Sequence, residues 1–153
     1  MILDKKDRKI LNLLQKNARI SNADLADQIN LSPSACLRRV RILETEGVID
    51  GYSTIINQAS IGRPTNVFVE VTLEDQSEDS LSTFEAAVKE CSDIMECYLM
   101  SGDADYLLRV VVADTSDFER VHKSLGQLPK LARTRSSFVL RTVSKKIATI
   151  IPE

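Results

Sequence analysis

Apolar residues recur at helical spacing in three stretches at the start of the chain. The first predicted helix covers Leu3 to Asn17, the second follows Ser21 and ends at Asn30, and the third follows Ser32 and ends at Glu46–Gly47. Their apolar faces consist of Ile10, Leu11 and Leu14 in the first helix, Leu25, Ala26 and Ile29 in the second, and Cys36, Leu37, Val40 and Leu43 in the third.

The residues before each helix carry the signals that begin a helix. Asp4, Ser21 and Ser32 are side chains that cap free backbone amides, and Pro33 suits the first helical position. Asn30 tolerates the left-handed conformation that ends a helix. Two short helices joined by a turn of about three residues, the second carrying arginines, form a helix-turn-helix, which places its second helix in the major groove of DNA.

The third helix has a polar face that allows two interpretations. Ser34, Arg38, Arg41 and Thr45 project to one side, either as an ordinary solvated surface or as a face that lies against DNA. The turn and the preceding packing helix favour DNA. We therefore expect contacts to bases or phosphates from Ser21, Ser32, Ser34, Ala35, Arg38, Arg39 and Arg41. Ile42 projects toward the polar side, either packing under the next segment or contacting a partner.

The back half alternates strands and helices. Strands are predicted at Asn66–Leu73, Ile94–Ser101, Tyr106–Ala113 and Arg135–Ser144. Two helices with the same apolar spacing lie between them, one with Leu81, Phe84, Val88 and Cys91 and one with Phe118, Val121, Leu125 and Leu128. Tyr106–Ala113 is apolar throughout, which indicates a central strand. The order βαββαβ is that of the ferredoxin-like fold, with both helices on one face of an antiparallel sheet.

The predicted fold class is therefore α+β, with two domains. A three-helix helix-turn-helix domain of the winged type covers residues 1–56, and its last part, residues 48–56, reads as a strand or small wing. Residues 57–66, with Gly62 and Pro64, form the linker, and residues 67–153 form the ferredoxin-like domain. The uncovered face of its sheet needs a partner, which predicts a homo-oligomer formed through this domain.

Composition and charge narrow the class of protein. The net charge is −2, but residues 1–60 hold nine Lys/Arg and seven Asp/Glu while residues 61–153 hold eleven and fifteen. A basic front half and an acidic back half indicate two tasks. No run of about 18 apolar residues and no signal-peptide core occur, which predicts a cytoplasmic protein without a membrane partner.

The loop Gly102-Asp103-Ala104-Asp105 is the candidate ligand site. It is either a hairpin turn or a place where backbone amides receive a carboxylate and an aspartate receives an ammonium group. The second interpretation describes recognition of an α-amino acid. Leu99 or Met100 next to the loop would provide an apolar wall, which favours an effector of the leucine or methionine type.

Catalytic chemistry is not indicated. The chain has one histidine, His122, and its three cysteines, Cys36, Cys91 and Cys97, match no zinc spacing, so neither a metal nor a resident cofactor is expected. The competing hypotheses are a small-molecule enzyme on a ferredoxin-like dimer and an architectural DNA-binding protein without a ligand response.

The chain resembles the leucine-responsive regulatory protein/AsnC (feast/famine) family of transcriptional regulators. The matching motifs are Leu3–Leu11, Ala18–Ser21, Leu31–Pro33, Arg38–Glu44, Gly47–Tyr52, Glu96–Cys97, Ser101–Leu108 and Thr134–Arg135. The resemblance implies a sequence-specific regulator that senses an amino acid, forms dimers through the ferredoxin-like half and commonly assembles to octamers. The ligand then sits between subunits.

The resemblance also extends the candidate effector site. The expected residues are Met100, Ser101, Gly102, Asp103, Asp105, Tyr106, Thr134 and Arg135. Thr134 and Arg135 either begin a strand or complete the ligand site from a neighbouring subunit. Two positions depart from the family pattern: Lys130 stands where a glycine commonly follows Leu-Pro, which bears on the local turn, and Ala104 is smaller than usual, which bears on the shape of the pocket.

Overall fold

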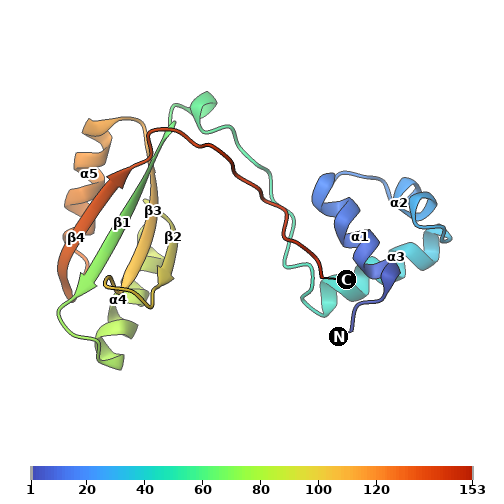
Figure 1. Ribbon diagram of the computed structural model, residues 1–153, viewed down its shortest axis with the longest axis horizontal. Helices are drawn as coiled ribbons and strands as arrows, with labels where there is room; N and C mark the ends of the chain where they lie inside the picture. The colour runs from blue at the N-terminus through green and yellow to red at the C-terminus, as the bar shows by residue number, and fades with distance from the viewer. Residues whose placement is uncertain (1, 153) are drawn as a thin grey trace. The chain divides into compact units, whose positions relative to one another are not determined.

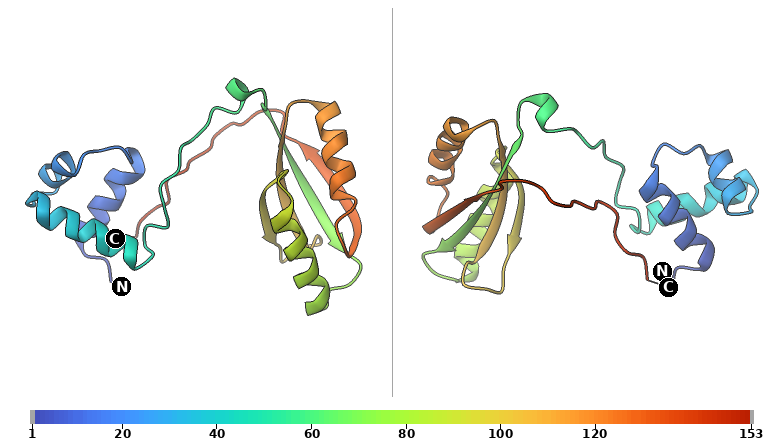
Figure 2. Two further views of the ribbon diagram at one scale, coloured as in Figure 1. Left: turned by 180° about the vertical axis from the view of Figure 1, so that it is seen from behind. Right: turned by 45° about the horizontal axis from the view of Figure 1, so that its top comes forward.

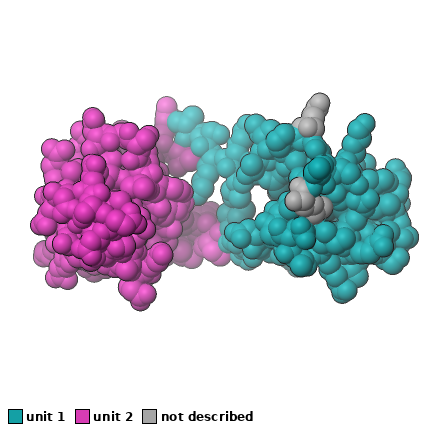
Figure 3. Space-filling view, turned by 90° about the horizontal axis from the view of Figure 1, so that it is seen from below, with its two compact units in different colours: residues 1–55, 143–153 teal, residues 56–142 magenta. Residues whose placement is uncertain are grey.

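The computed structural model describes residues 2–152 and divides into two compact units (Figure 1, Figure 3). Unit 1 contains the chain up to Ile55 and again from Val143 onward, and unit 2 contains Ile56–Thr142. The expected C-terminal domain ran to residue 153. Instead, residues 143–152 cluster with unit 1, where Ile151 packs against the helical core.

Unit 1 is built from three helices, α1 (Lys5–Lys16), α2 (Asn22–Gln28) and α3 (Pro33–Thr45). Their buried apolar residues form one core, consisting of Ile10, Leu11, Leu25, Ala26, Ile29, Cys36 and Leu43. Asp4 and Asp7 form a capping box at α1, and the hydroxyl of Ser32 accepts from the amide of Ala35 at α3. The expected helices and their caps are therefore present.

Two long-range contacts hold the helices together. The ammonium group of Lys6 donates to the carbonyl oxygens of Ile29 (2.6 Å) and Asn30 (2.9 Å), which end α2. Asn30 has a φ of 52°, in the left-handed region expected for a residue that ends a helix. A cation at the C-terminal end of α2 also complements the helix dipole.

The strand or wing expected over residues 48–56 is not formed. These residues have no strand assignment, because no second strand of unit 1 offers a row of amides and carbonyls to pair with. The amides of Val48 and Ile49 instead donate to the carbonyl of Leu43 at 2.9 and 3.0 Å, and Ile49 packs against the core of unit 1.

Unit 2 is a four-stranded antiparallel sheet with two helices on one face (Figure 2). The strands are β1 (Thr65–Leu73), β2 (Ile94–Leu99), β3 (Tyr106–Val112) and β4 (Leu131–Phe138), in the spatial order β2-β3-β1-β4. The helices are α4 (Glu78–Glu90) and α5 (Thr115–Leu125), and a 3-10 turn, η1 (Ala59–Ile61), precedes β1. The βαββαβ order and the central place of β3 match the sequence-based expectation.

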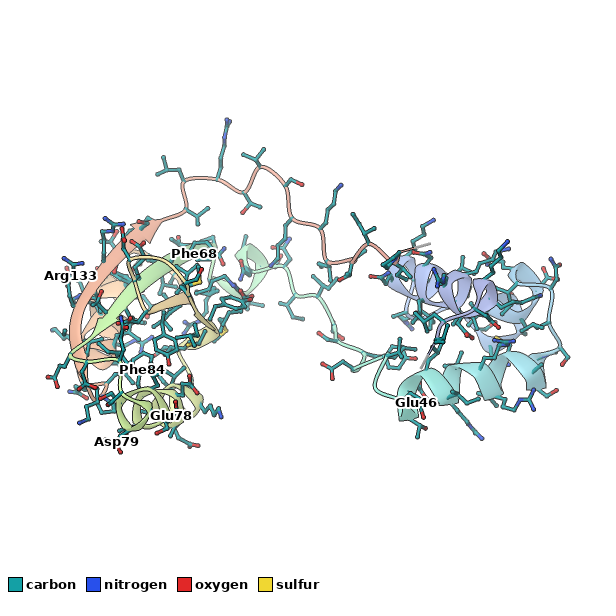
Figure 4. The ribbon with its side chains drawn as sticks, turned by 60° about the horizontal axis from the view of Figure 1, so that its bottom comes forward. Glu46, Phe68, Glu78, Asp79, Phe84 and Arg133 are labelled. Carbon is teal, nitrogen blue, oxygen red and sulfur yellow. The ribbon has the colours of Figure 1, made fainter. Side chains whose placement is uncertain are left out.

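The register separates the two faces of the sheet. Val69 opposes Leu108 on β3, and both side chains are buried against the helices with Phe84 of α4. Phe68, labelled in Figure 4, opposes Arg109 on the other face, which neither α4 nor α5 covers. This open face carries Phe68 and Glu70 of β1, Glu96 and Tyr98 of β2, Leu107 and Arg109 of β3, and Arg133 and Arg135 of β4.

The last strand lies earlier than predicted. It was expected at Arg135–Ser144, but β4 runs from Leu131 to Phe138, where Phe138 opposes Val67 of β1. One further hydrogen bond of 2.9 Å, from the amide of Val139 to the carbonyl of Asn66, follows before the strand assignment ends. Lys130 makes the turn before β4 with a φ of 63°, and its carbonyl accepts from the amide of Glu74 at 2.8 Å. The position where the family commonly has glycine thus has a left-handed backbone.

Candidate DNA-binding face and ligand loop

The exposed side of α3 is a shallow hollow of about 360 Å³. It is lined by Ser34, Leu37, Arg38, Arg41, Ile42, Thr45 and Glu46. Figure 4 labels Glu46, which lies at the C-terminal end of this helix. The expected polar face is therefore present, but Leu37, which was assigned to the packing side, lies on this face with Ile42.

The three arginines of α3 have different partners. Among the described residues, the side chains of Arg38 and Arg41 form no hydrogen bond or ion pair. Arg39 instead donates to Asp4 and to the buried Asp7, both at 2.7 Å. These carboxylates raise the pKa of Arg39. Arg39 was expected to contact DNA, and it instead holds α3 against the start of α1.

The serines expected at DNA phosphates are helix caps. The hydroxyl of Ser21 accepts from the amide of Asp24 and donates to its carboxylate, at 3.0 and 2.6 Å. The hydroxyl of Ser32 lies 3.2 Å from that of Ser34, and both residues are exposed. Ala35 is half-buried behind them. The exposed start of α3 is thus polar and small, as a surface that approaches DNA requires.

The ligand loop, residues 100–105, joins β2 to β3. It is closed by a hydrogen bond of 2.8 Å from the amide of Met100 to the carbonyl of Asp105. Ser101, Gly102 and Asp103 are exposed, and a Cβ atom added at Gly102 would meet nothing within 4 Å. The tip of the loop is therefore free to approach a ligand or another chain.

Asp105 and Tyr106 face the interior of unit 2. One carboxylate oxygen of Asp105 accepts from the amide of Leu73 and the other from the side chain of Gln76, both at 2.8 Å. Tyr106 is fully buried against Phe84 and donates to Glu85 at 2.7 Å. Burial is the largest cause that raises the pKa of Tyr106. Both were expected at the effector, yet within one chain they fix the base of the loop.

Thr134 and Arg135 are neighbours on β4 but point to opposite faces. Thr134 opposes Val71 on the helix-covered face, and Arg135 opposes Glu70 on the open face. The Nε of Arg135 lies 2.5 Å from a carboxylate oxygen of Glu70, which lowers the pKa of Glu70. Asp103 acts electrostatically on Arg135. Arg135 therefore lies on the open face as the partner of Glu70, whereas Thr134 faces the helices.

Sequence reasoning missed two residues around this loop. Glu70 is the only charged residue in an otherwise apolar or neutral strand, Thr65–Leu73, and that exception is the signal that marks it. Gln76 has no local signal, because its contact with Asp105 spans 29 positions. Within residues 2–152, no group of three His, Cys, Asp or Glu side chains is placed to hold a metal ion. No helix there is long and apolar enough to cross a membrane.

Two family models match the two halves of the chain. A winged helix-turn-helix DNA-binding domain matches residues 3–50, and the Lrp/AsnC ligand binding domain matches residues 66–148. The first covers α1 to α3, and the second covers the sheet of unit 2 from the second residue of β1 onward, together with the ligand loop.

Curated relatives and solved structures agree with these models. The leucine-responsive regulatory proteins of Salmonella typhimurium and Escherichia coli are 42% and 41% identical over 97% of this chain and 92% of their own. A transcriptional regulator from Neisseria meningitidis in complex with L-Met and an AsnC family regulator from Agrobacterium tumefaciens are 31% and 32% identical, each with a TM-score of 0.91 over 97% of both chains. These relatives are regulators and not enzymes. The chain belongs to the Lrp/AsnC family of transcriptional regulators, with a DNA-binding helix-turn-helix and an amino acid-binding domain.

Proposed function

We propose that α3 enters the major groove of a specific DNA site, with Arg38 and Arg41 as its basic contacts. The observation that carries this proposal is the division of labour among the arginines. Arg39 forms ion pairs with Asp4 and Asp7. Arg38 and Arg41 form no hydrogen bond or ion pair through their side chains among residues 2–152, and they share the exposed hollow with Ser34. Guanidinium groups of this kind reach phosphates or the O6/N7 edge of guanine.

The exposed hollow on α3 of one copy offers two basic side chains, Arg38 and Arg41, so tight binding requires several copies. The open face of the sheet is the surface that a second copy covers, because half-buried Phe68 and Leu107 lie there beside exposed Tyr98. A dimer reads a roughly palindromic site with half-sites about 10 bp apart or a multiple of that. Further assembly to an octamer follows the resemblance to the family. The protein acts in the cytoplasm, where its DNA target lies.

The effector is a free α-amino acid with an apolar side chain, of the leucine or methionine type. Arg135 is an exposed guanidinium that exchanges Glu70, its partner within one chain, for the carboxylate of the effector. Exposed Asp103 is a carboxylate for its ammonium group, and exposed Leu99 and Met100 offer an apolar wall. The names of the relatives agree with this chemistry, since two are leucine-responsive proteins and one neighbour is a complex with L-Met. The effector acts by binding one assembly or spacing of the DNA-binding units more tightly than another.

A binding titration tests this function. Duplexes enriched by the full chain from a random pool are titrated at one fixed salt concentration, with and without each of the twenty amino acids, while light scattering reports oligomer size. Leucine or methionine is expected to change affinity or size. A protein that enriches no sequence is not a specific regulator, and one that responds to no amino acid lacks the proposed effector. Salt is fixed because phosphate contacts make affinity fall steeply with it.

A further inference from the structure

The hollow on α3 combines apolar and cationic side chains. On a helix, residues three and four apart are neighbours, so Leu37 lies beside Ser34 and Arg41, and Arg38 lies beside Ile42. Leu37 and Ile42 are 39% and 44% exposed, and neither belongs to the apolar residues packed against the core of unit 1. Two large, partly exposed aliphatic side chains thus flank two guanidinium groups on this surface.

This arrangement differs from a single surface leucine, which is ordinary on a soluble protein. The two apolar side chains share one concave surface with Arg38 and Arg41, which form no ion pair within residues 2–152, and with Glu46 at the end of the helix. A polyanion that also presents a small apolar group complements this surface, because its charges pair with the guanidinium groups and its apolar group packs against the aliphatic side chains. The major groove of DNA is such a surface, because each thymine presents a C5-methyl group there between strands of phosphates.

We propose that Leu37 is a specificity-determining residue that contacts the C5-methyl group of a thymine. The proposal rests on the proposed DNA binding by α3 and names one base that it reads. Leu37 is preferred to Ile42 because the N-terminal half of a recognition helix contacts base edges. Leu37 is the fifth residue of α3, close to the exposed, small start of the helix, whereas Ile42 lies near its C-terminal end.

The test removes one methyl group from the DNA and the matching side chain from the protein. Each thymine of an enriched duplex is replaced singly by deoxyuridine, which lacks only the C5-methyl group, and the affinity of the full chain is measured at fixed salt. We expect one position per half-site at which uridine weakens binding about fourfold, the effect of burying one methyl group. Leu37→Ala is expected to bind the thymine and uridine duplexes alike, and Leu37→Met is expected to restore the difference.

Ile42→Ala is the matched control, because Ile42 is equally exposed on the same helix. It is expected to keep the preference for thymine at the position that Leu37 reads. The proposal is overturned if no single uridine changes affinity, if Leu37→Ala keeps the preference, or if Ile42→Ala alone removes it. A chain that enriches no sequence at all fails at the earlier step of specific DNA binding. Far-UV circular dichroism confirms that each variant is folded, as Ala and Met suit a helix.

Discussion

The side-chain amide of Gln15 on α1 pairs with the backbone of Thr149 through two hydrogen bonds. Its Nε2 donates to the carbonyl of Thr149 at 3.1 Å, and its Oε1 accepts from the amide of Thr149 at 2.6 Å. Arg8 also donates to the carbonyl of Pro152. The C-terminal segment is thus held along α1, and the helix-turn-helix unit is joined to unit 2 by two stretches of chain instead of one.

Replacing Gln15 is expected to release this segment. Gln15→Ala removes both hydrogen bonds to Thr149, which lie at the surface, so the free energy of unfolding of unit 1 should fall by about 0.5–1 kcal/mol. Hydrogen exchange at the amide of Thr149 measures the release directly. Asn12→Ala is the control, because Asn12 is exposed on the same helix and should leave that amide protected. Equal protection in both variants would contradict the contact.

We expect Arg39 to contribute to the stability of unit 1 and Arg38 to contribute to DNA binding. Arg39→Ala leaves the buried carboxylate of Asp7 without its cation, which should lower the free energy of unfolding by about 1–3 kcal/mol in a urea titration. The side chain of Arg38 is exposed and forms no hydrogen bond or ion pair within the described chain, so Arg38→Ala should change the free energy of unfolding by less than about 0.5 kcal/mol. It should weaken DNA binding and reduce the salt slope by about 1 for each phosphate that Arg38 neutralises. The reverse pattern would mean that Arg39 is the residue that binds DNA.

In unit 2, we expect Asp105 to contribute to stability and Asp103 to contribute to the effector response. Asp105→Ala leaves the buried amide of Leu73 without an acceptor, at a cost of about 1–3 kcal/mol in the free energy of unfolding. Asp103 is exposed, so Asp103→Ala should keep the stability and lose the response of DNA binding to the amino acid. Thermal unfolding and the effector titration measure both. An Asp103→Ala variant that still responds would remove this carboxylate from the site.

Local sequence patterns predicted the helices and strands. The roles of the candidate site residues depend on contacts between residues far apart in the sequence, which local patterns do not reveal. Asp4 and Ser32 mark helix starts within three residues, and the apolar run of β3 identifies a central strand without its partners. The ion pair of Arg39 with Asp4 spans 35 positions, and no local signal separates Arg39 from Arg38. The bounds of β4 were wrong because Leu131–Phe138 has few apolar residues, so the sequence pattern gives no clear signal for where this strand begins.

Lys130 offers a stabilising substitution. Its φ of 63° costs a residue with a Cβ atom about 1–2 kcal/mol, whereas glycine adopts this conformation freely but loses more entropy on folding. Lys130→Gly should therefore raise the free energy of unfolding by about 0.5–1 kcal/mol. Lys123→Gly, at an exposed position in α5, should instead lower it by about 0.5–1 kcal/mol. Chemical denaturation measures the free energy of unfolding of both variants. A lower value for Lys130→Gly than for the wild type would show that the turn does not strain lysine.

Asp75 should make unit 2 sensitive to acid. Hydrogen bonds from the side chain and amide of Ser77 lower the pKa of Asp75 from 3.8 to about 2, and the amide of Ser77 lies 2.9 Å from its Oδ1. Because the folded pKa is depressed, the stabilisation is present above pH 3.8 and is lost as the pH falls toward 2. Asp75→Asn keeps an acceptor oxygen but removes the titrating group, so the stability of unit 2 should fall less steeply across this range than in the wild type. Urea titrations at several pH values measure both slopes, and identical slopes would mean that Asp75 titrates alike in the folded and unfolded chains.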